Sequence, residues 1–130
     1  MANFSSYNFK LKGAQHVKDN GKLLALAVNV AKEDSYAVAT SKIIASAAMT
    51  GADVTLATDV NDLKITVNGK SIDPVATAAG GDDLVVLVVD DVNDEVILCQ
   101  DATDRAITNE AGDMVTIPAL IAHVRELSAV

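Results

Sequence analysis

The stretch that decides the fold is Leu84–Asp91, which reads LVVLVVDD. Its six consecutive apolar residues, four of them Val, favour an extended strand, because β-branched side chains pack well on a pleated surface. A strand with no polar alternation is typical of one that is buried on both faces. The polar turn Asp91–Asp94 and the apolar stretch Glu95–Gln100 follow, so residues 84–100 are predicted to form an antiparallel hairpin.

Outward from this hairpin, turn-forming residues recur about every 8–12 residues through the second half of the chain, which is typical of an all-β fold. Val54–Thr58 is a predicted strand, and so is Lys22–Ala31, although its alanines are also compatible with a helix. Met114–Ile117 and Ala119–Glu126 close the chain, separated by Pro118, which cannot donate a ladder hydrogen bond. We therefore expect a mainly β fold, a compact sandwich or barrel with the jelly roll among the compatible arrangements, and a short N-terminal arm or helix.

A second hairpin is predicted around Asn68-Gly69. The preceding Leu63–Val67 alternates apolar and polar residues, as a half-buried strand does. Asn and Gly both tolerate the positive φ that a type I′ turn requires. Lys70–Asp73 is then the returning strand, which ends at Pro74.

The sequence pattern divides the whole chain into two units. Residues 1–20 are predicted to be an N-terminal arm with a short amphipathic helix over Tyr7–Lys18, and residues 21–130 a single β-rich domain. Tyr36–Met49 is compatible with either secondary structure: its Ala and Ser content permits a helix, whereas Lys42–Ala45 suits a strand.

Charge excludes two classes of partner. The formal net charge is −8, and the ten Lys and Arg residues are scattered along the chain. A nucleic-acid binder needs clustered basic residues, and an anionic membrane surface would repel this chain. Residues 1–20 lack the apolar core of a secretory signal, and no stretch reaches the roughly 20 apolar residues that span a bilayer. We expect no nucleic-acid or membrane partner, and synthesis in a reducing cytoplasm.

The sequence contains few candidates for catalytic, redox-active or metal-binding residues. Cys99 is the only cysteine, so no internal disulfide forms, and its apolar neighbours predict a buried residue rather than a reactive thiol. His16 and His123 are the only histidines: we predict His16 to be solvated and His123 to lie at the surface or an interface. Asp91–Glu95 begins like a calcium loop but lacks the later Gly and Glu of an EF-hand, so turn chemistry is favoured there. We predict no cofactor and no enzymatic activity.

The order of motifs resembles that of small virion structural proteins of tailed bacteriophages, most like capsid decoration (cement) proteins. The resemblance covers most of the chain as a pattern rather than as one diagnostic motif. The matching pieces are Tyr7-Asn8-Phe9, Lys22–Leu26, Met49-Thr50-Gly51, Leu84–Asp91, Glu95–Gln100, Ala106–Asn109 and Val115–Ala119.

This resemblance implies a role on the capsid surface of a virion. It implies a homotrimer that clamps neighbouring copies of the major capsid protein after synthesis in the host cytoplasm. The N-terminal aromatics Phe4, Tyr7 and Phe9 are the predicted partner-binding residues, because an aromatic-rich arm can add contacts on a neighbour. Two other functions stay open: a tail or head–tail connector component, and a small calcium- or carbohydrate-binding β-sandwich module.

Overall fold

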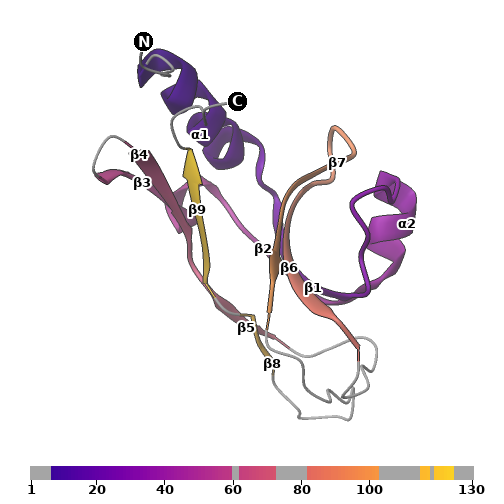
Figure 1. Cartoon of the computed structure of the whole chain (residues 1–130). Coiled ribbons are helices and arrows are strands. Elements are labelled where there is room, and N and C mark those ends of the chain that lie inside the picture. Colours follow the sequence, from indigo (N-terminus) through magenta and orange to yellow (C-terminus); the bar gives the residue numbers. More distant parts are fainter. Residues whose placement is uncertain (1–6, 60–61, 73–81, 103–114, 118, 125–130) are drawn as a thin grey trace.

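The computed structural model describes residues 7–59, 62–72, 82–102, 115–117 and 119–124. These residues form two facing antiparallel sheets, a smaller strand pair and two α-helices (Figure 1). The expected mainly β fold with a short N-terminal helix is confirmed.

The first sheet has four strands in the order β2-β1-β6-β7. Their bounds are Ile43–Ala48 for β2, Leu23–Val28 for β1, Leu84–Asp90 for β6 and Glu95–Asp101 for β7. All neighbours are antiparallel, and the register places Leu23 opposite Val89. All seven residues of β6 are buried, and β6 pairs with β7 as the predicted hairpin.

The turn between β6 and β7 is built by the side chain of Asp90. Its Oδ1 accepts hydrogen bonds from the backbone N–H groups of Val92 and Asn93, and its Oδ2 accepts one from Asn93 Nδ2 at 2.8 Å. Asp94 then has a φ of 55°, a left-handed conformation that Asp and Asn adopt more readily than most residues. Asp90 is only 1% exposed, and these bonds replace the water its carboxylate loses.

The second sheet has three strands in the order β3-β4-β9, and a separate antiparallel pair joins β5 to β8. Their bounds are Val54–Asp59 for β3, Asp62–Val67 for β4, Lys70–Ile72 for β5, Val115–Ile117 for β8 and Leu120–Val124 for β9. The break predicted at Pro118 falls between β8 and β9, which pair with different strands. Pro118 itself lies outside the described residues.

The predicted hairpin at Asn68-Gly69 is wrong. Strand β4 pairs with β3 on one side and with β9 on the other, so neither edge is open to β5. The backbone N–H of Asn68 donates instead to the carbonyl of Asp53 at 2.9 Å. Asn29 and Asp94 are the non-glycine residues with positive φ in the described part, so Asn68 does not adopt the type I′ conformation.

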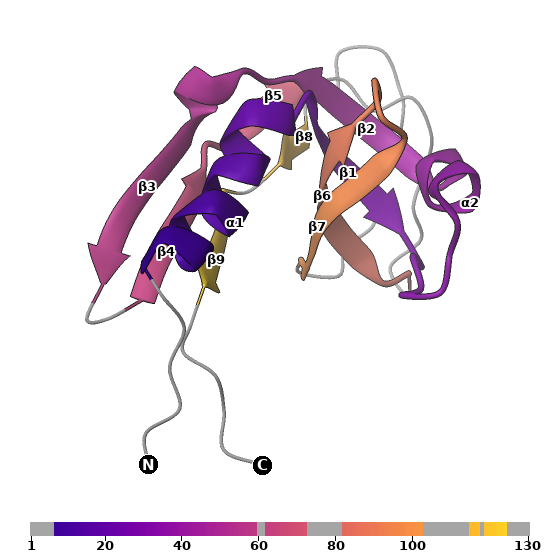
Figure 2. The same ribbon diagram turned by 90° about the horizontal axis from the view of Figure 1, so that it is seen from above.

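Two helices and one 3₁₀ turn complete the described elements. They are α1 over Tyr7–Asn20, α2 over Tyr36–Ser41 and η1 over Gly51–Asp53. Figure 2 shows α1 alongside the β3-β4-β9 sheet, on the side that faces the other sheet, and α2 on the far side of the first sheet. The ambiguous segment Tyr36–Met49 is therefore both: α2 first, begun by the Ser35 side chain accepting from Val38 N–H, and then β2.

Gly21 lets α1 turn directly into β1. A Cβ at this position would lie 2.8 Å from the carbonyl oxygen of Val17 and 3.0 Å from Met49 Cε. The helix therefore ends against its neighbours without room for a side chain, and it extends two residues beyond the predicted Tyr7–Lys18, to Asn20.

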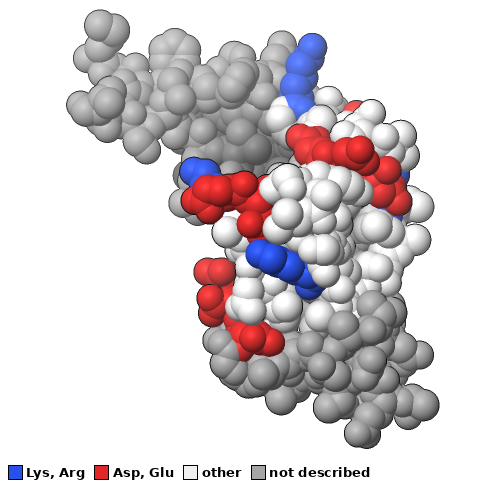
Figure 3. All heavy atoms as spheres, turned by 90° about the vertical axis from the view of Figure 1, so that its right-hand side faces the viewer, with Lys and Arg blue, Asp and Glu red and all other residues white. Residues whose placement is uncertain are grey.

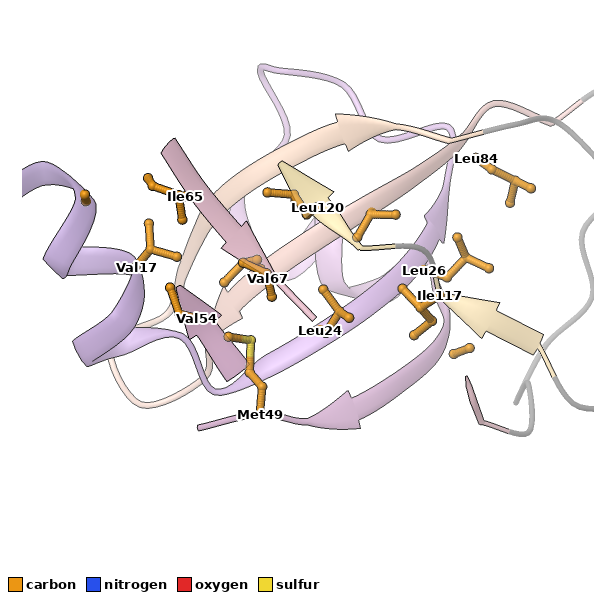
Figure 4. Close-up of a cluster of buried hydrophobic side chains, with 14 of the residues drawn as sticks. Val17, Leu24, Leu26, Met49, Val54, Ile65, Val67, Leu84, Ile117 and Leu120 are labelled. Carbon is orange, nitrogen blue, oxygen red and sulfur yellow. The ribbon is translucent and has the colours of Figure 1, made fainter. Parts of the chain in front are cut away.

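The main core lies between the two sheets and α1 (Figure 4). Val17 enters from α1, Leu24 and Leu26 from β1, and Ile65 and Val67 from β4. A second, smaller cluster lies on the opposite face of the first sheet, under the segment that contains α2. Its buried members are Ala25, Ala27, Val85, Leu87 and Val89.

One side chain connects the two sheets at their edge strands. Gln100 of β7 donates from Nε2 to the carbonyl of Ile121 in β9 at 2.8 Å, and its Oε1 accepts from the N–H of the same residue at 3.3 Å. An amide side chain thus makes the two bonds that a neighbouring strand would make, and it closes this part of the β9 edge.

Candidate docking groove beside β7

A concave surface lies on the outer face of the first sheet. It is a pocket of about 580 Å³ between β7 and the segment that leads into α2, and we call it the outer groove. The α2 side contributes Val30, Ala31, Lys32, Asp34, Tyr36 and Ala39. The β7 side contributes Asp94, Glu95, Val96, Ile97 and Cys99.

A second hollow of about 430 Å³ adjoins the outer groove and shares Val30 with it. Its other lining residues are Asp83, Leu84, Val85, Asp101 and Ala102. The lining of the first hollow includes Glu95, where β7 begins, and that of the second includes Asp101, where β7 ends. Together the two hollows follow β7 along its length.

Strand β7 is the last strand of its sheet. Among the described strands it pairs with β6 alone, so the backbone groups on its other edge have no strand partner there. The register shifts between Val88 and Val89, which lie opposite Leu98 and Val96, so Ile97 is an extra residue in a bulge. Ile97 is among the residues that line the outer groove, although its side chain packs against the main core on the inner face, whereas Val96 packs against the outer cluster.

The wall opposite β7 is held by a polar network. Asp34 Oδ2 accepts from Lys42 Nζ at 2.7 Å and from the backbone N–H of Ala31 at 2.9 Å. These bonds, that of Lys42 first, hold the pKa of the Asp34 carboxyl below its ordinary value. Lys42 Nζ also donates to the carbonyl of Asn29, which has a φ of 56°. The loop before α2 is thus fixed at three points, and this wall of the groove is preformed.

Carboxylates gather at the rim of the groove. Asp91, Asp94, Glu95 and Asp101 are exposed at the two ends of β7. Figure 3, which views the side of the molecule that carries α2, shows separate acidic clusters around a largely uncharged surface. Lys32 is the one Lys or Arg residue among those that line the outer groove, and the lining of the second hollow includes none.

Two titratable side chains in the groove respond to this negative potential. Burial raises the pKa of the Tyr36 hydroxyl, and the charges of Asp94 and Asp91 raise it further. Partial desolvation in the groove likewise raises the pKa of the Cys99 thiol, with a second contribution from the charge of Asp101. Both ionisations are disfavoured, so at neutral pH the groove has an uncharged floor and a negative rim.

Cys99 corrects a prediction from the sequence. Its apolar neighbours indicated a buried residue, yet the side chain is exposed. The reason is the position of β7 at the sheet edge: Cys99 lies opposite Leu87 on the outer face, where α2 does not cover it. Its raised thiol pKa still means that it is not an activated nucleophile.

The two histidines do not form one site. His16 Nε2 lies 2.7 Å from Glu95 Oε1, so the pair joins α1 to the start of β7, and both side chains are about half exposed (47% and 48%). The predicted solvated His16 therefore has a protein partner that sequence spacing did not suggest. His123 lies in β9, with partial exposure.

The calcium-like segment is used for turn formation. Both carboxylate oxygens of Asp90 accept from the turn itself, and Glu95 contacts His16. In the described residues, no three His, Cys, Asp or Glu side chains are grouped so that they could hold a metal ion.

The predicted partner-binding aromatics lie at the beginning of the chain. Phe4 falls outside the described residues. Tyr7 and Phe9 belong to the first turns of α1 rather than to an extended arm, and their side chains are not among those described. Sequence reasoning did not identify the outer groove. The sequence feature that could have indicated it is β7, a strand with polar residues at both ends that directly follows the apolar strand β6.

No helix among the described residues has the length and apolarity to cross a membrane. Comparisons with protein-family models, with curated proteins and with solved structures returned no match.

Proposed function

We propose that this chain is a non-enzymatic structural protein of a tailed-phage virion, a decoration protein that docks on the major capsid protein as a homotrimer. The observation that carries the proposal is the edge of β7 that no described strand pairs, beside the outer groove. A free sheet edge with an adjoining apolar groove suits attachment to another protein, because added strands bind through backbone hydrogen bonds.

The order of motifs supports the same role. The two pieces Leu84–Asp91 and Glu95–Gln100, which carry much of the resemblance to virion proteins, form the β6–β7 hairpin. Its first strand is buried on both faces, and its second has an outer edge that none of the described strands pairs. One hairpin thus combines the centre of the core with the candidate attachment surface.

The test is where the protein binds and in which oligomeric state. The full chain is purified, its mass in solution is measured by light scattering, and it is mixed with decoration-free capsids and, separately, with tails of the encoding phage. The proposal expects a trimer that co-sediments with capsids at a saturable stoichiometry, with density on the shell in electron micrographs.

Two results would count against this proposal. Binding to tails alone would replace it with the tail or head–tail connector alternative. A monomer that binds neither particle would reject a virion role for this chain.

A further inference from the structure

We propose that the outer groove binds an extended segment of a partner protein, with alternate apolar side chains and a Lys or Arg at each end, which adds as a fifth strand along β7. The inference deepens the proposed function and rests on it for the identity of the partner. The chemistry of the segment is argued from the groove itself.

The backbone of β7 provides the first argument. In the described residues its outer edge has no strand partner, whereas β9, the neighbouring edge of the other sheet, is closed at Ile121 by the Gln100 side chain. An incoming strand would therefore be blocked at Ile121 of β9, whereas no described strand blocks it at β7. It would lie about 4.8 Å from β7, which brings its outer side chains next to the hollows.

The shape and polarity of the hollows provide the second argument. Val30, Tyr36 and Val96 give the larger one an apolar lining, and Val85 continues it in the smaller one. Successive side chains of a strand point to opposite faces, so every second residue of the segment would face this surface. Alternate apolar residues match it.

Charge provides the third argument and selects between two occupants. A second copy of this chain, paired antiparallel through its own β7, would bring Glu95 of one copy toward Asp101 of the other. Like charges opposed across a strand pair are destabilising. A segment with basic ends meets Asp94 and Glu95 at one end and Asp101 at the other, so the rim favours a basic partner over a second copy.

The probe is a fluorescein-labelled peptide of about nine residues that alternates Val and Thr and has Lys at both ends. Its binding to the full chain is measured by fluorescence anisotropy at low and high salt. One control peptide has Glu in place of each Lys. Another carries N-methyl groups on the backbone amides that would face β7, which removes their hydrogen bonds.

The expected result is saturable binding of the Lys-ended peptide that weakens at high salt. The Glu-ended and N-methylated peptides should each bind at least about tenfold more weakly. Equal binding of the Glu-ended peptide would overturn the charge argument, and equal binding of the N-methylated peptide would overturn strand addition.

Two pairs of altered proteins, each with its control, test where the peptide binds. Asp94→Lys reverses one rim charge and should weaken the Lys-ended peptide about fivefold, whereas Asp19→Lys makes the same charge change on the exposed face of α1 and should leave its affinity unchanged. Attachment of a bulky maleimide to Cys99, the only cysteine, should block binding, while Cys99→Ser should bind like the unmodified chain. Equal effects of the two charge reversals would contradict the placement.

The same variants separate this inference from the proposed function. Capsid binding that Asp94→Lys and the Cys99 maleimide leave intact would keep the decoration role and reject the groove as its contact. Charge-dependent peptide binding by a chain that binds no capsid would keep the groove and reject the decoration role.

Discussion

The two faces of β6 are equally buried but differ in what covers them. The inner face carries Leu84, Val86 and Val88 and packs against a second sheet and α1. The outer face carries Val85, Leu87 and Val89 and is covered by the segment with α2 on one side only, with the outer groove on the other. One strand can thus complete a core with one face and support a partly uncovered surface with the other.

The largest effect is expected from a charge on the inner face. Val86→Asp would place an unpaired carboxylate among side chains of both sheets, at a cost of several kcal/mol, which is comparable to the whole stability of a small domain. We expect no cooperative thermal transition by circular dichroism. Val92→Asp at the 72% exposed tip of the β6–β7 turn is the matched control and should melt like the unchanged chain. A folded, soluble Val86→Asp variant would contradict the two-sheet core.

Leucine truncation compares the two faces directly. Leu26→Ala in the main core and Leu87→Ala in the outer cluster both remove a fully buried side chain, so each should lower the free energy of unfolding by about 2–5 kcal/mol. We expect the outer value at the low end of that range, because the smaller cluster beside the groove can collapse or admit water. Urea denaturation measures both. A larger loss for Leu87→Ala would mean that the outer face is the dominant core.

The Gln100 connection tests whether the edges of the two sheets depend on each other. Gln100→Ala removes both bonds to Ile121 and should lower the free energy of unfolding by about 0.5–1.5 kcal/mol, since water can replace them at this exposed position. Amide hydrogen exchange at Ile121 should accelerate. Gln100→Glu is the informative partner variant, because it can accept from the N–H of Ile121 but cannot donate to its carbonyl.

The smallest effect is expected from two ion pairs, one in each region. Lys70 Nζ lies 2.9 Å from Asp53 Oδ1 beside the β5 end of the main core, and Lys42 pairs with Asp34 in the groove wall. In both cases the lysine holds the aspartate pKa below its ordinary value. The unfolded chain therefore binds more protons in acid. This stabilisation is complete above the unfolded-state pKa of about 3.9 and is lost as the pH falls through the folded-state value.

Asp53→Asn and Asp34→Asn should each flatten the dependence of stability on pH between about pH 5 and 2. Urea midpoints across that range measure the change. If only Asp53→Asn has an effect, the groove wall does not contribute to global stability. A steeper dependence in either variant would contradict the direction of the pKa shift.

The parts of the fold that sequence reasoning predicted are those with strong local signals. The apolar run of β6, the turn at Asp91–Asp94 and the strand β7 follow from neighbouring residues. The hairpin at Asn68-Gly69 had an equally strong local signal and was wrong, because β3 and β9 occupy both edges of β4. That competition is between segments far apart in the chain, and no window around Asn68 contains it.

The candidate groove was harder to predict from the sequence for the same reason. Its two walls come from residues 30–39 and 94–99, and their proximity depends on the strand order β1-β6-β7. Cys99 was predicted to be buried because its neighbours are apolar, whereas its exposure reflects the place of β7 as the last described strand of its sheet. Burial at a sheet edge is a property of the complete sheet.

The position of β6 at the centre of the first sheet also governs the order of events during synthesis. Strand β1 pairs with β6 along its whole length, from Leu23 opposite Val89 to Val28 opposite Leu84. A ribosome adds about 5–20 residues per second, so β1 waits several seconds for this partner. During that interval the apolar side chains of β1 lack half of their final cover. Nascent chains stalled before residue 84 should therefore bind chaperones, and release should follow the emergence of β6.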